Sequence, residues 1–521
     1  MASFKPTGLC AIALAGLVAL GATLPAAAAP DRARVIVKYK AGASAEARAA
    51  IARLGGRVVV DLDEVDAVAI TLPRRAAALL ERSRAVEFVE PDHIQHQMAV
   101  SDPSGPPYEL GQQVPYGIKM VQADQVSDSA AGNRTVCIVD SGIDGTHPDH
   151  AGNLLSGENL TTSGVWNSDE SGHGTHVAGT VAAVNQPNIG VVGVLPNKKL
   201  NLYIAKVFDA SGSTSSSTIA KAMLRCRKNG NANVISMSLG GAGASRLQGI
   251  VVRFLANRNI LMLAAAGNDG TSGYSYPASF PEVMSVAAID MNKAHASFSQ
   301  FNDQVEIAAP GVDVLSTVPV GSNHEGTLDV GASSYDVLPM DGSPVASATG
   351  PLADFGIGDT PVPGSMTGKV CLISRGTISF ADKVLNCQSS GGIGAVIYNN
   401  VAGVLNGTLG GVATTIPSVG ALQSDGTTML SQLGLSATVA VVVSPYDYAL
   451  FNGTSMATPH ASAVAALVWS HHPNCTAAEM RASLNNSAMD LGPVGRDDQF
   501  GHGLIQAKAA VDRITALGCG N

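Results

Sequence analysis

Four short motifs of this 521-residue chain carry side chains whose chemistry can be combined. Asp140 and Asn268 each come at the end of an apolar run, whereas His173 and Ser455 each open one. A serine hydroxyl is a weak nucleophile near neutral pH and needs a neighbouring base. A serine, a histidine, a carboxylate and an amide donor are therefore the groups that acyl transfer through a covalent intermediate would need.

Each of the four groups would have its own role in that chemistry. His173 would take the proton of Ser455 and later give it to the leaving amine, while Asp140 would hold the imidazole in the useful tautomer and stabilise its cation. Ser455 at a helix start would place its own backbone N–H near the developing oxyanion, in the favourable field of the helix dipole. Asn268 would supply a second donor to that oxyanion.

Taken singly, each motif has a simpler interpretation. The sequence DSG at 140–142 is usually a turn, and Gly-Asn at 267–268 often is too. His173 with His176 could ligate a metal ion. A Thr-Ser pair before a helix, as at 454–455, is often only a helix cap. The four motifs together, in the order Asp, His, Asn, Ser, are far more specific than any one of them.

That order and the segments GHGTHVAG (172–179) and GTSMATPH (453–460) resemble the subtilisin-like serine proteases, or subtilases. The resemblance implies catalytic roles for Asp140, His173 and Ser455, an oxyanion role for Asn268, and a structural role for His176. It implies an α/β fold, a parallel sheet with helices on both faces. The segments VPYG (114–117) and FGHGLI (500–505) resemble the family's mature N-terminal and closing segments.

The resemblance also places the substrate. The segment SLGG at 238–241 resembles the family segment that pairs with the substrate backbone by strand addition. The segment AAG at 265–267 resembles the opposite wall of the pocket for the residue before the cut, and small walls predict room for a large apolar or aromatic side chain. The expected substrate contacts are Ser238, Leu239, Gly240, Gly241, Ala265, Ala266 and Gly267.

The elements that must position these groups can be expected from the apolar pattern. Strand-like and helix-like runs alternate from about 116 to 319, which is typical of a parallel sheet whose functional groups collect at the carboxyl ends of its strands. Expected strands cover 136–139, 202–205, 233–237 and 260–264, and expected helices cover 177–183, 217–228, 455–470, 477–487 and 504–514.

Two units are expected before the catalytic domain. Residues 1–29 have a positive start, an apolar stretch and a run of alanines, which together are typical of an export signal. The alternative is a membrane anchor, but the stretch is short for a span of about 20 residues. Residues 30–110 are expected to form a ferredoxin-like α+β pro-domain of order β-α-β-β-α-β, followed by a linker. The resemblance implies that this pro-domain inhibits the enzyme.

The catalytic domain is expected in two parts, 111–324 and 446–521, separated by an insert. The stretch 325–445 is rich in Gly, Ser and Val and has short strand-like runs with one clear helix, about 379–389. Its segments near 368–400 resemble a protease-associated (PA) domain, so a β-rich PA-like insert is expected.

Six cysteines remain once the first 29 residues are removed. An even number in an exported chain predicts three disulfides, with buried free thiols as the alternative. Cys371–Cys387 is expected inside the insert, Cys475–Cys519 at the C-terminus, and Cys137–Cys226 resembles a bridge of the proteinase K branch.

The resemblance further implies a structural calcium ion, which requires several oxygen ligands. An ordinary surface loop is the alternative. Because the loop is one residue longer than the usual pattern, Gln186 or Asn188 could replace Asn185. The expected ligands are Gln112, Asp149, Asn185 and the backbone of Ile189 and Val191.

Composition excludes several function classes. A net charge of -9 argues against a nucleic-acid-binding surface, which needs clustered Lys and Arg. No later segment has the apolar length of a membrane span, so no membrane contact is expected after signal removal. A monomer is expected, with protein or peptide substrates and its own pro-domain as partners. A lipase would place its serine in Gly-x-Ser-x-Gly before the acid and histidine. A catalytically dead binding protein would not need all four groups. We therefore expect a secreted serine endopeptidase, made as a self-processed precursor.

Overall fold

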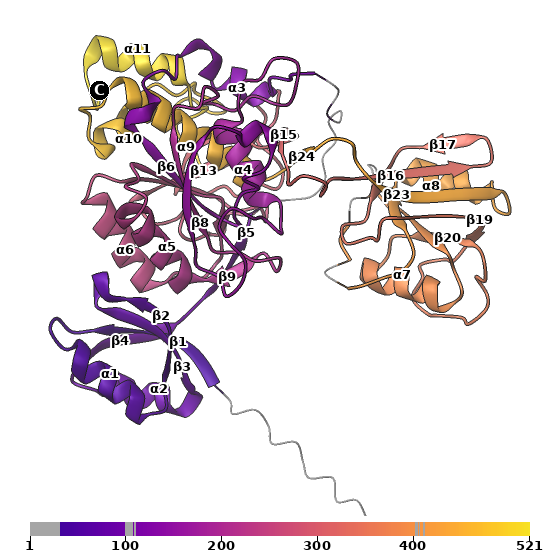
Figure 1. Ribbon diagram of the computed structural model, residues 1–521, viewed down its shortest axis with the longest axis horizontal. Helices are drawn as coiled ribbons and strands as arrows, with labels where there is room; N and C mark the ends of the chain where they lie inside the picture. The colour runs from indigo at the N-terminus through magenta and orange to yellow at the C-terminus, as the bar shows by residue number, and fades with distance from the viewer. Residues whose placement is uncertain (1–31, 99–107, 109–110, 402–404, 406, 410–411) are drawn as a thin grey trace, which may run out of the picture.

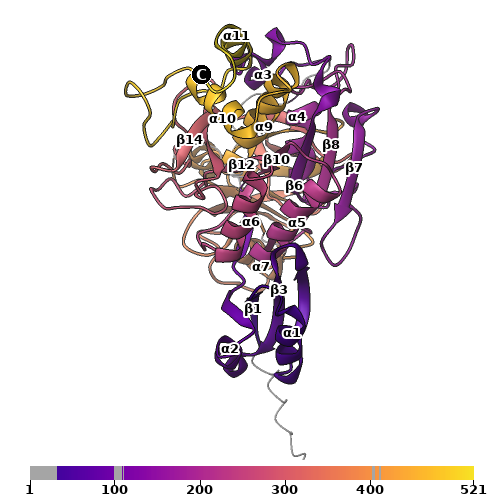
Figure 2. The same ribbon diagram turned by 90° about the vertical axis from the view of Figure 1, so that its left-hand side faces the viewer.

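The computed structural model describes residues 32–98, 108, 111–401, 405, 407–409 and 412–521, so the expected export signal lies outside it. Figure 1 shows three bodies, with the insert extending to the right, and in both Figure 1 and Figure 2 the pro-domain lies beneath helices α5 and α6 of the catalytic domain. Within the described residues, no helix has the length and apolar character to cross a membrane.

The pro-domain has the expected order of elements. Its antiparallel sheet has the strand order β2-β3-β1-β4. One face of the sheet packs on its own helices, and the other joins the apolar core beneath α5 and α6. The elements are β1 (Arg32–Tyr39), α1 (Ser44–Arg53), β2 (Arg57–Leu62), β3 (Ala67–Pro73), α2 (Arg74–Glu81) and β4 (Val86–Pro91).

The catalytic domain is built on a seven-stranded parallel sheet with the order β14-β13-β12-β10-β6-β8-β7. Almost every residue of its central strands is buried, as expected for a sheet covered on both faces. The strands are β6 (Thr135–Asp140), β7 (Leu154–Asn159), β8 (Asn201–Lys206), β10 (Val234–Met237), β12 (Leu261–Ala265), β13 (Val283–Ile289) and β14 (Val305–Pro310).

Helices cover the two faces of this sheet and form two separate cores. One core contains residues of α5 and α6, and the other contains residues of the remaining catalytic-domain helices. The predicted α/β fold is therefore confirmed. The helices are α5 (Ser216–Lys228) and α6 (Arg246–Ala256) on one face, and α3 (Tyr116–Met120), α4 (His173–Ala182), α9 (Thr454–His471), α10 (Ala477–Asn486) and α11 (Ala507–Leu517) on the other.

The insert leaves and re-enters the catalytic domain at one strand pair, in which β15 (Val314–Thr317) runs antiparallel to β24 (Tyr448–Phe451). Its own sheet has eight strands of mixed direction. A second helix, α8 (Gln423–Leu430), accompanies the expected one, α7 (Phe380–Ser389). The strands are β16 (His324–Val330), β17 (Ser333–Tyr335), β18 (Val337–Pro339), β19 (Ala346–Asp354), β20 (Val370–Ser374), β21 (Gly394–Tyr398), β22 (Ser418–Ala421) and β23 (Ser436–Val443).

Three local expectations differ from the structure. Part of the expected linker forms a strand, β5 (Ile94–Gln97), which has no apolar alternation and exists because it pairs with the catalytic domain. Helix α4 begins at 173, four residues earlier than expected. Helix α11 begins at 507 rather than 504, because Ile505 donates its N–H to Ala308 instead of joining a helix.

Disulfides join the three pairs that were expected. Cys137–Cys226 links β6 to α5, Cys371–Cys387 links β20 to α7, and Cys475–Cys519 ties the C-terminal residues to the segment after α9.

Candidate active site

The carboxylate and the histidine meet at the carboxyl end of the parallel sheet. Asp140 is the last residue of β6 and His173 is the first of α4. The Nδ1 of His173 lies 2.7 Å from Oδ1 of Asp140, and both side chains are almost completely buried. The backbone N–H of Ser141 donates to the same Oδ1 at 2.8 Å. The imidazole is therefore held by a carboxylate that is itself fixed by its own strand end.

Helix α4 is fixed where His173 begins it. The carboxylate of Asp169 accepts the backbone N–H groups of Gly172 (2.9 Å) and Thr175 (2.8 Å), which the first helical turn leaves free. Gly174 has to be a glycine, because a Cβ there would lie 2.2 Å from the carbonyl oxygen of Gly142.

Ser455 and Asn268 converge on one carbonyl oxygen, that of Met98. The Nδ2 of Asn268 donates to it at 2.6 Å and the backbone N–H of Ser455 at 3.2 Å. The hydroxyl of Ser455 donates to the same oxygen. Two donors on one carbonyl beside a serine hydroxyl match the arrangement of an oxyanion hole.

His173 keeps one nitrogen free at this site. Its Nε2 is buried and has no hydrogen-bond partner among the described residues. The hydroxyl of Ser455 is engaged by the Met98 carbonyl instead. The structure therefore shows the serine occupied by the chain's own pro-segment.

Thr454 is a residue of the site that the sequence interpretation took only as a possible helix cap. Its N–H (2.9 Å) and its hydroxyl (2.7 Å) both donate to Oδ1 of Asn268. The amide oxygen of Asn268 is thereby occupied, which leaves its Nδ2 directed at the Met98 carbonyl. Only the position of Thr454 beside Ser455 could have pointed to this role.

Strand β5 lies in the site as a substrate strand would. It pairs antiparallel with β11 (Leu239–Gly240) on one side and with β9 (Ser213–Ser215) on the other. One residue further, the N–H of Met98 donates to the carbonyl oxygen of Ser238 at 3.3 Å. The expected backbone-pairing segment is therefore brought to the site, with the pro-segment in place of a substrate.

The side chain of Met98 lies against Gly240, where a Cβ would be 3.0 Å from the methionine Cε and 2.4 Å from Oγ of Ser275. That hydroxyl is buried and unpartnered among the described residues. Gly241 pairs with Tyr276 rather than with β5. Ser275 was missed by the sequence interpretation, which considered only the two walls of the pocket.

The other expected wall, 265–267, lies directly before Asn268. Ala265 ends β12 and is buried, and Ala266 packs with Ala287 and Val305. The N–H of Gly267 donates to the Thr454 hydroxyl at 3.2 Å. A hydrogen bond therefore joins this segment to Thr454, the residue that holds the Asn268 amide.

His176 faces away from this chemistry. Its Nε2 lies 2.9 Å from the carbonyl oxygen of Val314 and its ring stacks on Phe451 at 4.3 Å. Burial lowers the pKa of His176 to about 3, so it is neutral. The position agrees with the structural role expected for it.

Two carboxylates of the pro-domain cap two helices of the catalytic domain. Glu90 accepts the N–H groups of Arg246 (2.9 Å) and Leu247 (3.0 Å) at the start of α6. Asp92 accepts the N–H of Ser217 at 2.9 Å at the start of α5, and Arg34 holds it at 2.7 Å. Helix N-termini favour such negative groups, so these contacts fix the pro-domain against α5 and α6.

The residues expected to bind calcium gather in part. The amide Nε2 of Gln112 contacts Oδ1 of Asn185 at 2.9 Å and the carbonyl oxygen of Gln186 at 2.7 Å. Asp149 is fully buried, and burial raises its pKa although the N–H of Val191 donates to it at 2.8 Å.

Rotation of the Gln112 amide by half a turn would direct its oxygen at this group, and amide O and N are assigned from such contacts. The side-chain oxygens of Gln112 and Asn185 and the carbonyl oxygen of Gln186 then form a set that fits an oxygen-ligated cation. Asp149 is linked to this set through the Gln186 side-chain amide, which lies 3.4 Å from its Oδ1. Val191 presents its N–H to Asp149, and the carbonyl ligands expected at Ile189 and Val191 remain a prediction.

Three family models match different parts of this chain. The subtilase family model matches residues 132–342 and 425–503, the PA domain model matches 340–429, and the fervidolysin N-terminal prodomain model matches 27–92. Subtilisin amylosacchariticus of Bacillus subtilis subsp. amylosacchariticus is 38% identical over 300 residues, which are 56% of this chain and 74% of that protein. Subtilisin E of Bacillus subtilis (strain 168) is 37% identical over the same shares.

Solved structures show the same likeness. A psychrophilic subtilisin-like protease from the Antarctic psychrotroph Pseudoalteromonas sp. AS-11 is 42% identical, with a TM-score of 0.56, and the match covers 78% of this chain and 99% of that one. Fervidolysin from Fervidobacterium pennivorans, 21% identical with a TM-score of 0.60 over 92% of this chain and 61% of that one, shares the fold. The chain therefore belongs to the subtilase family of serine proteases, with a family-type pro-domain and an inserted PA domain.

Proposed function

We propose that this protein is a secreted endopeptidase whose nucleophile is Ser455, whose base is His173 and whose orienting acid is Asp140. The observation that carries the proposal is the Met98 carbonyl oxygen, held by Asn268 Nδ2 at 2.6 Å and by the N–H of Ser455 at 3.2 Å. A peptide carbonyl bound in that way is polarised toward attack by the serine beside it.

The proposed reaction assigns one step to each of these groups. His173, fixed through Nδ1 by Asp140, would accept the hydroxyl proton of Ser455 at its free Nε2. The oxygen of Ser455 would bond to the scissile carbonyl carbon, and the negative charge would move to the oxygen bound by Asn268 and the Ser455 N–H. Return of the proton to the leaving amine, with re-formation of the carbonyl and cleavage of the C–N bond, would give an acyl-enzyme, which water then hydrolyses.

The same placement supports self-processing at the peptide bond after Met98. The pro-segment lies along β11 and β9, and its Met98 occupies the position of the residue before the cut. After cleavage the pro-domain would remain as an inhibitor, since Glu90 and Asp92 still cap α6 and α5. Because a methionine lies at this position, the enzyme should prefer substrates with a long apolar residue before the cut.

The test compares the wild-type precursor with Ser455→Ala. Wild type should release a fragment ending at Met98, appear in the culture medium and react covalently with a fluorophosphonate. Ser455→Ala should remain full length and unlabelled. Maturation of Ser455→Ala at the wild-type rate in pure protein would refute both the assigned nucleophile and self-processing.

We propose in addition that calcium binds at Gln112, Asn185 and Asp149 and stabilises the fold. The support is the contact of the Gln112 amide with Oδ1 of Asn185 and with the carbonyl oxygen of Gln186, whose side-chain amide in turn lies 3.4 Å from Oδ1 of Asp149. A cation that binds only the folded chain raises stability by mass action.

A further inference from the structure

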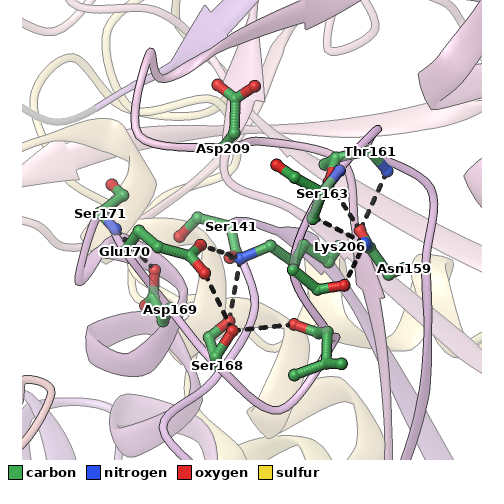
Figure 3. Close-up of polar contacts among 12 residues, drawn as sticks. Ser141, Asn159, Thr161, Ser163, Ser168, Asp169, Glu170, Ser171, Lys206 and Asp209 are labelled. Carbon is green, nitrogen blue, oxygen red and sulfur yellow. Dashed lines mark hydrogen bonds and ion pairs between the residues drawn. The ribbon is translucent and has the colours of Figure 1, made fainter.

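A buried lysine lies beside the Asp140–His173 pair. Lys206 ends β8 and pairs in register with Asp140 on the neighbouring strand. Its side chain has no exposed surface. The ammonium donates to the carbonyl oxygens of Ser141 at 2.7 Å and Ser168 at 2.9 Å, and it forms an ion pair with Glu170 (Figure 3).

The three acceptors come from two different segments of the chain. Ser141 follows Asp140 directly, whereas Ser168 and Glu170 belong to the loop that leads into α4 and His173. An ammonium has three N–H donors and no acceptor, so every donor of Lys206 is used. Lys206 therefore joins the segment that carries the acid to the segment that carries the base.

The loop between these acceptors is tied to the helix as well. Asp169 stands between Ser168 and Glu170, and its carboxylate caps the start of α4. Figure 3 shows the Lys206 ammonium directed at Ser141, Ser168 and Glu170. A shift of the ammonium would therefore move this loop and the cap of α4 together.

Stability alone is a poor reason for a charge at this place. Removal of an ammonium from water is costly, and an apolar side chain of similar volume often does as well or better. The partner Glu170 is 44% exposed. Burial alone would raise the pKa of Glu170, but the hydrogen bonds from Lys206 and Ser168 outweigh it and hold that pKa below its usual value, so the carboxylate is charged.

We propose that Lys206, supported by Glu170, is a positioning residue for catalysis. It holds the segments of Asp140 and His173 at the separation that gives their 2.7 Å contact. The inference rests on the proposed function, because it concerns the activation of Ser455. A purely structural lysine would affect folding and thermal stability but not the reactivity of the folded serine.

The experiment measures the reactivity of Ser455 directly. Pro-domain-free Lys206→Met, Glu170→Ala and Glu170→Gln are compared with wild type in two assays: the rate constant of fluorophosphonate labelling, and kcat and KM on a tetrapeptide. The matched control is Glu158→Gln, on β7 beside β8. The Glu158 carboxylate lies 3.6 Å from Arg225 and does not contact the Asp140–His173 pair. Circular dichroism and the thermal midpoint show whether each variant is folded.

Lys206→Met should lower the labelling rate and kcat by about 100-fold with KM little changed, since a misplaced base costs rate rather than binding. Glu170→Ala should lower the labelling rate and kcat by about threefold to tenfold, which corresponds to the free energy of one hydrogen bond. Glu170→Gln should recover most of that loss. Glu158→Gln should match wild type.

The inference would be overturned if folded Lys206→Met is labelled at the wild-type rate, or if it shows a raised KM with an unchanged kcat. If Lys206→Met does not fold, the Glu170 pair decides it, and wild-type labelling rates in both Glu170 variants would overturn it as well. A wild-type enzyme that is not labelled at all would refute the proposed function itself.

Discussion

The carbonyl oxygen of Met98 accepts a hydrogen bond from the backbone N–H of Ser455 at 3.2 Å, across 357 residues of sequence. The contact joins the last described residue of the pro-segment to the proposed nucleophile. The same contact shows that the site binds a peptide carbonyl, and it identifies the peptide bond after Met98 as the one expected to be cut.

Replacement of Met98 should therefore slow maturation. Met98→Asp would place a carboxylate against Gly240 and the buried Ser275 hydroxyl, and an unpaired charge in such a place should slow processing by roughly tenfold or more. The control is Met291→Asp, since Met291 is 53% exposed. Gel analysis of a processing time course gives the rate, and mass spectrometry of the released fragment gives its end. Processing of Met98→Asp at the same rate and the same bond would contradict the assigned position.

Removal of the oxyanion donors should lower kcat in a graded way. Asn268→Ala should lose about 10²–10³-fold in kcat with KM little changed, because its hydrogen bond serves the transition state. Thr454→Val keeps the volume but removes one hydrogen bond to Asn268, so the amide is less well directed and the loss should be about tenfold. The double variant should be no worse than Asn268→Ala. Additive losses in the double variant would show that Thr454 acts independently of Asn268.

The sequence was sufficient where chemistry is concentrated in short motifs. Asp140, His173, Asn268 and Ser455 could be named because their neighbours form specific octapeptides or end apolar strands. The parallel sheet could be predicted from apolar runs, because such a run is visible in the sequence without knowledge of the strand beside it.

Residues that act only through distant pairing could not be found. Strand β5 has the sequence IQHQ and no apolar pattern, so its role comes from the two catalytic-domain strands beside it. Ser275 and Lys206 lie in segments without a recognisable motif. Their roles are visible only in the folded chain, where Ser275 lies beside Gly240 and Lys206 contacts Ser141. Glu90 and Asp92 likewise cap helices far along the chain, which local sequence does not reveal.

The carboxylates of Glu90 and Asp92 should account for much of the affinity of the pro-domain for the mature enzyme. A fragment covering residues 32–98, added to mature enzyme, should inhibit it, and Glu90→Gln or Asp92→Asn should each raise the inhibition constant by about tenfold or more, the value of a charged hydrogen bond. Glu87→Gln is the control, because Glu87 lies on β4 with its side chain 47% exposed. Inhibition constants from peptide hydrolysis decide the matter. Equal constants for all four fragments would exclude the caps as the source of affinity.

Removal of calcium should speed thermal inactivation of the mature enzyme. At calcium a hundredfold above its dissociation constant the ion would add about 2.7 kcal/mol of stability. EDTA should therefore shorten the half-life at elevated temperature. Asp149→Asn should remove most of the difference between EDTA and millimolar calcium. Asp512→Asn should keep it, because the Asp512 side chain on α11 is 60% exposed. Identical wild-type half-lives in both conditions would rule out a stabilising ion at this site.

Buried neutral histidines should make the fold sensitive to acid. Burial lowers the pKa of His176 to about 3 and that of His460 to about 4. Both values lie below that of an unfolded histidine, about 6.5, so between pH 6.5 and 4 the unfolded state binds the additional protons. Stability is then fully present above pH 6.5 and falls with decreasing pH, by about 1.4 kcal/mol per pH unit for each histidine.

The measurement is urea unfolding of the inactive Ser455→Ala precursor at pH 6 and pH 5, which avoids self-digestion. His176→Gln or His460→Gln, added to that background, should each reduce the loss of unfolding free energy across this interval by about 1.2 kcal/mol. The carboxylates contribute equally to all three proteins, so they cancel in the comparison. The exposed His324 supplies the control, and His324→Gln should leave the pH dependence unchanged. If His176→Gln and His460→Gln also leave it unchanged, the buried imidazoles are not the source of acid sensitivity.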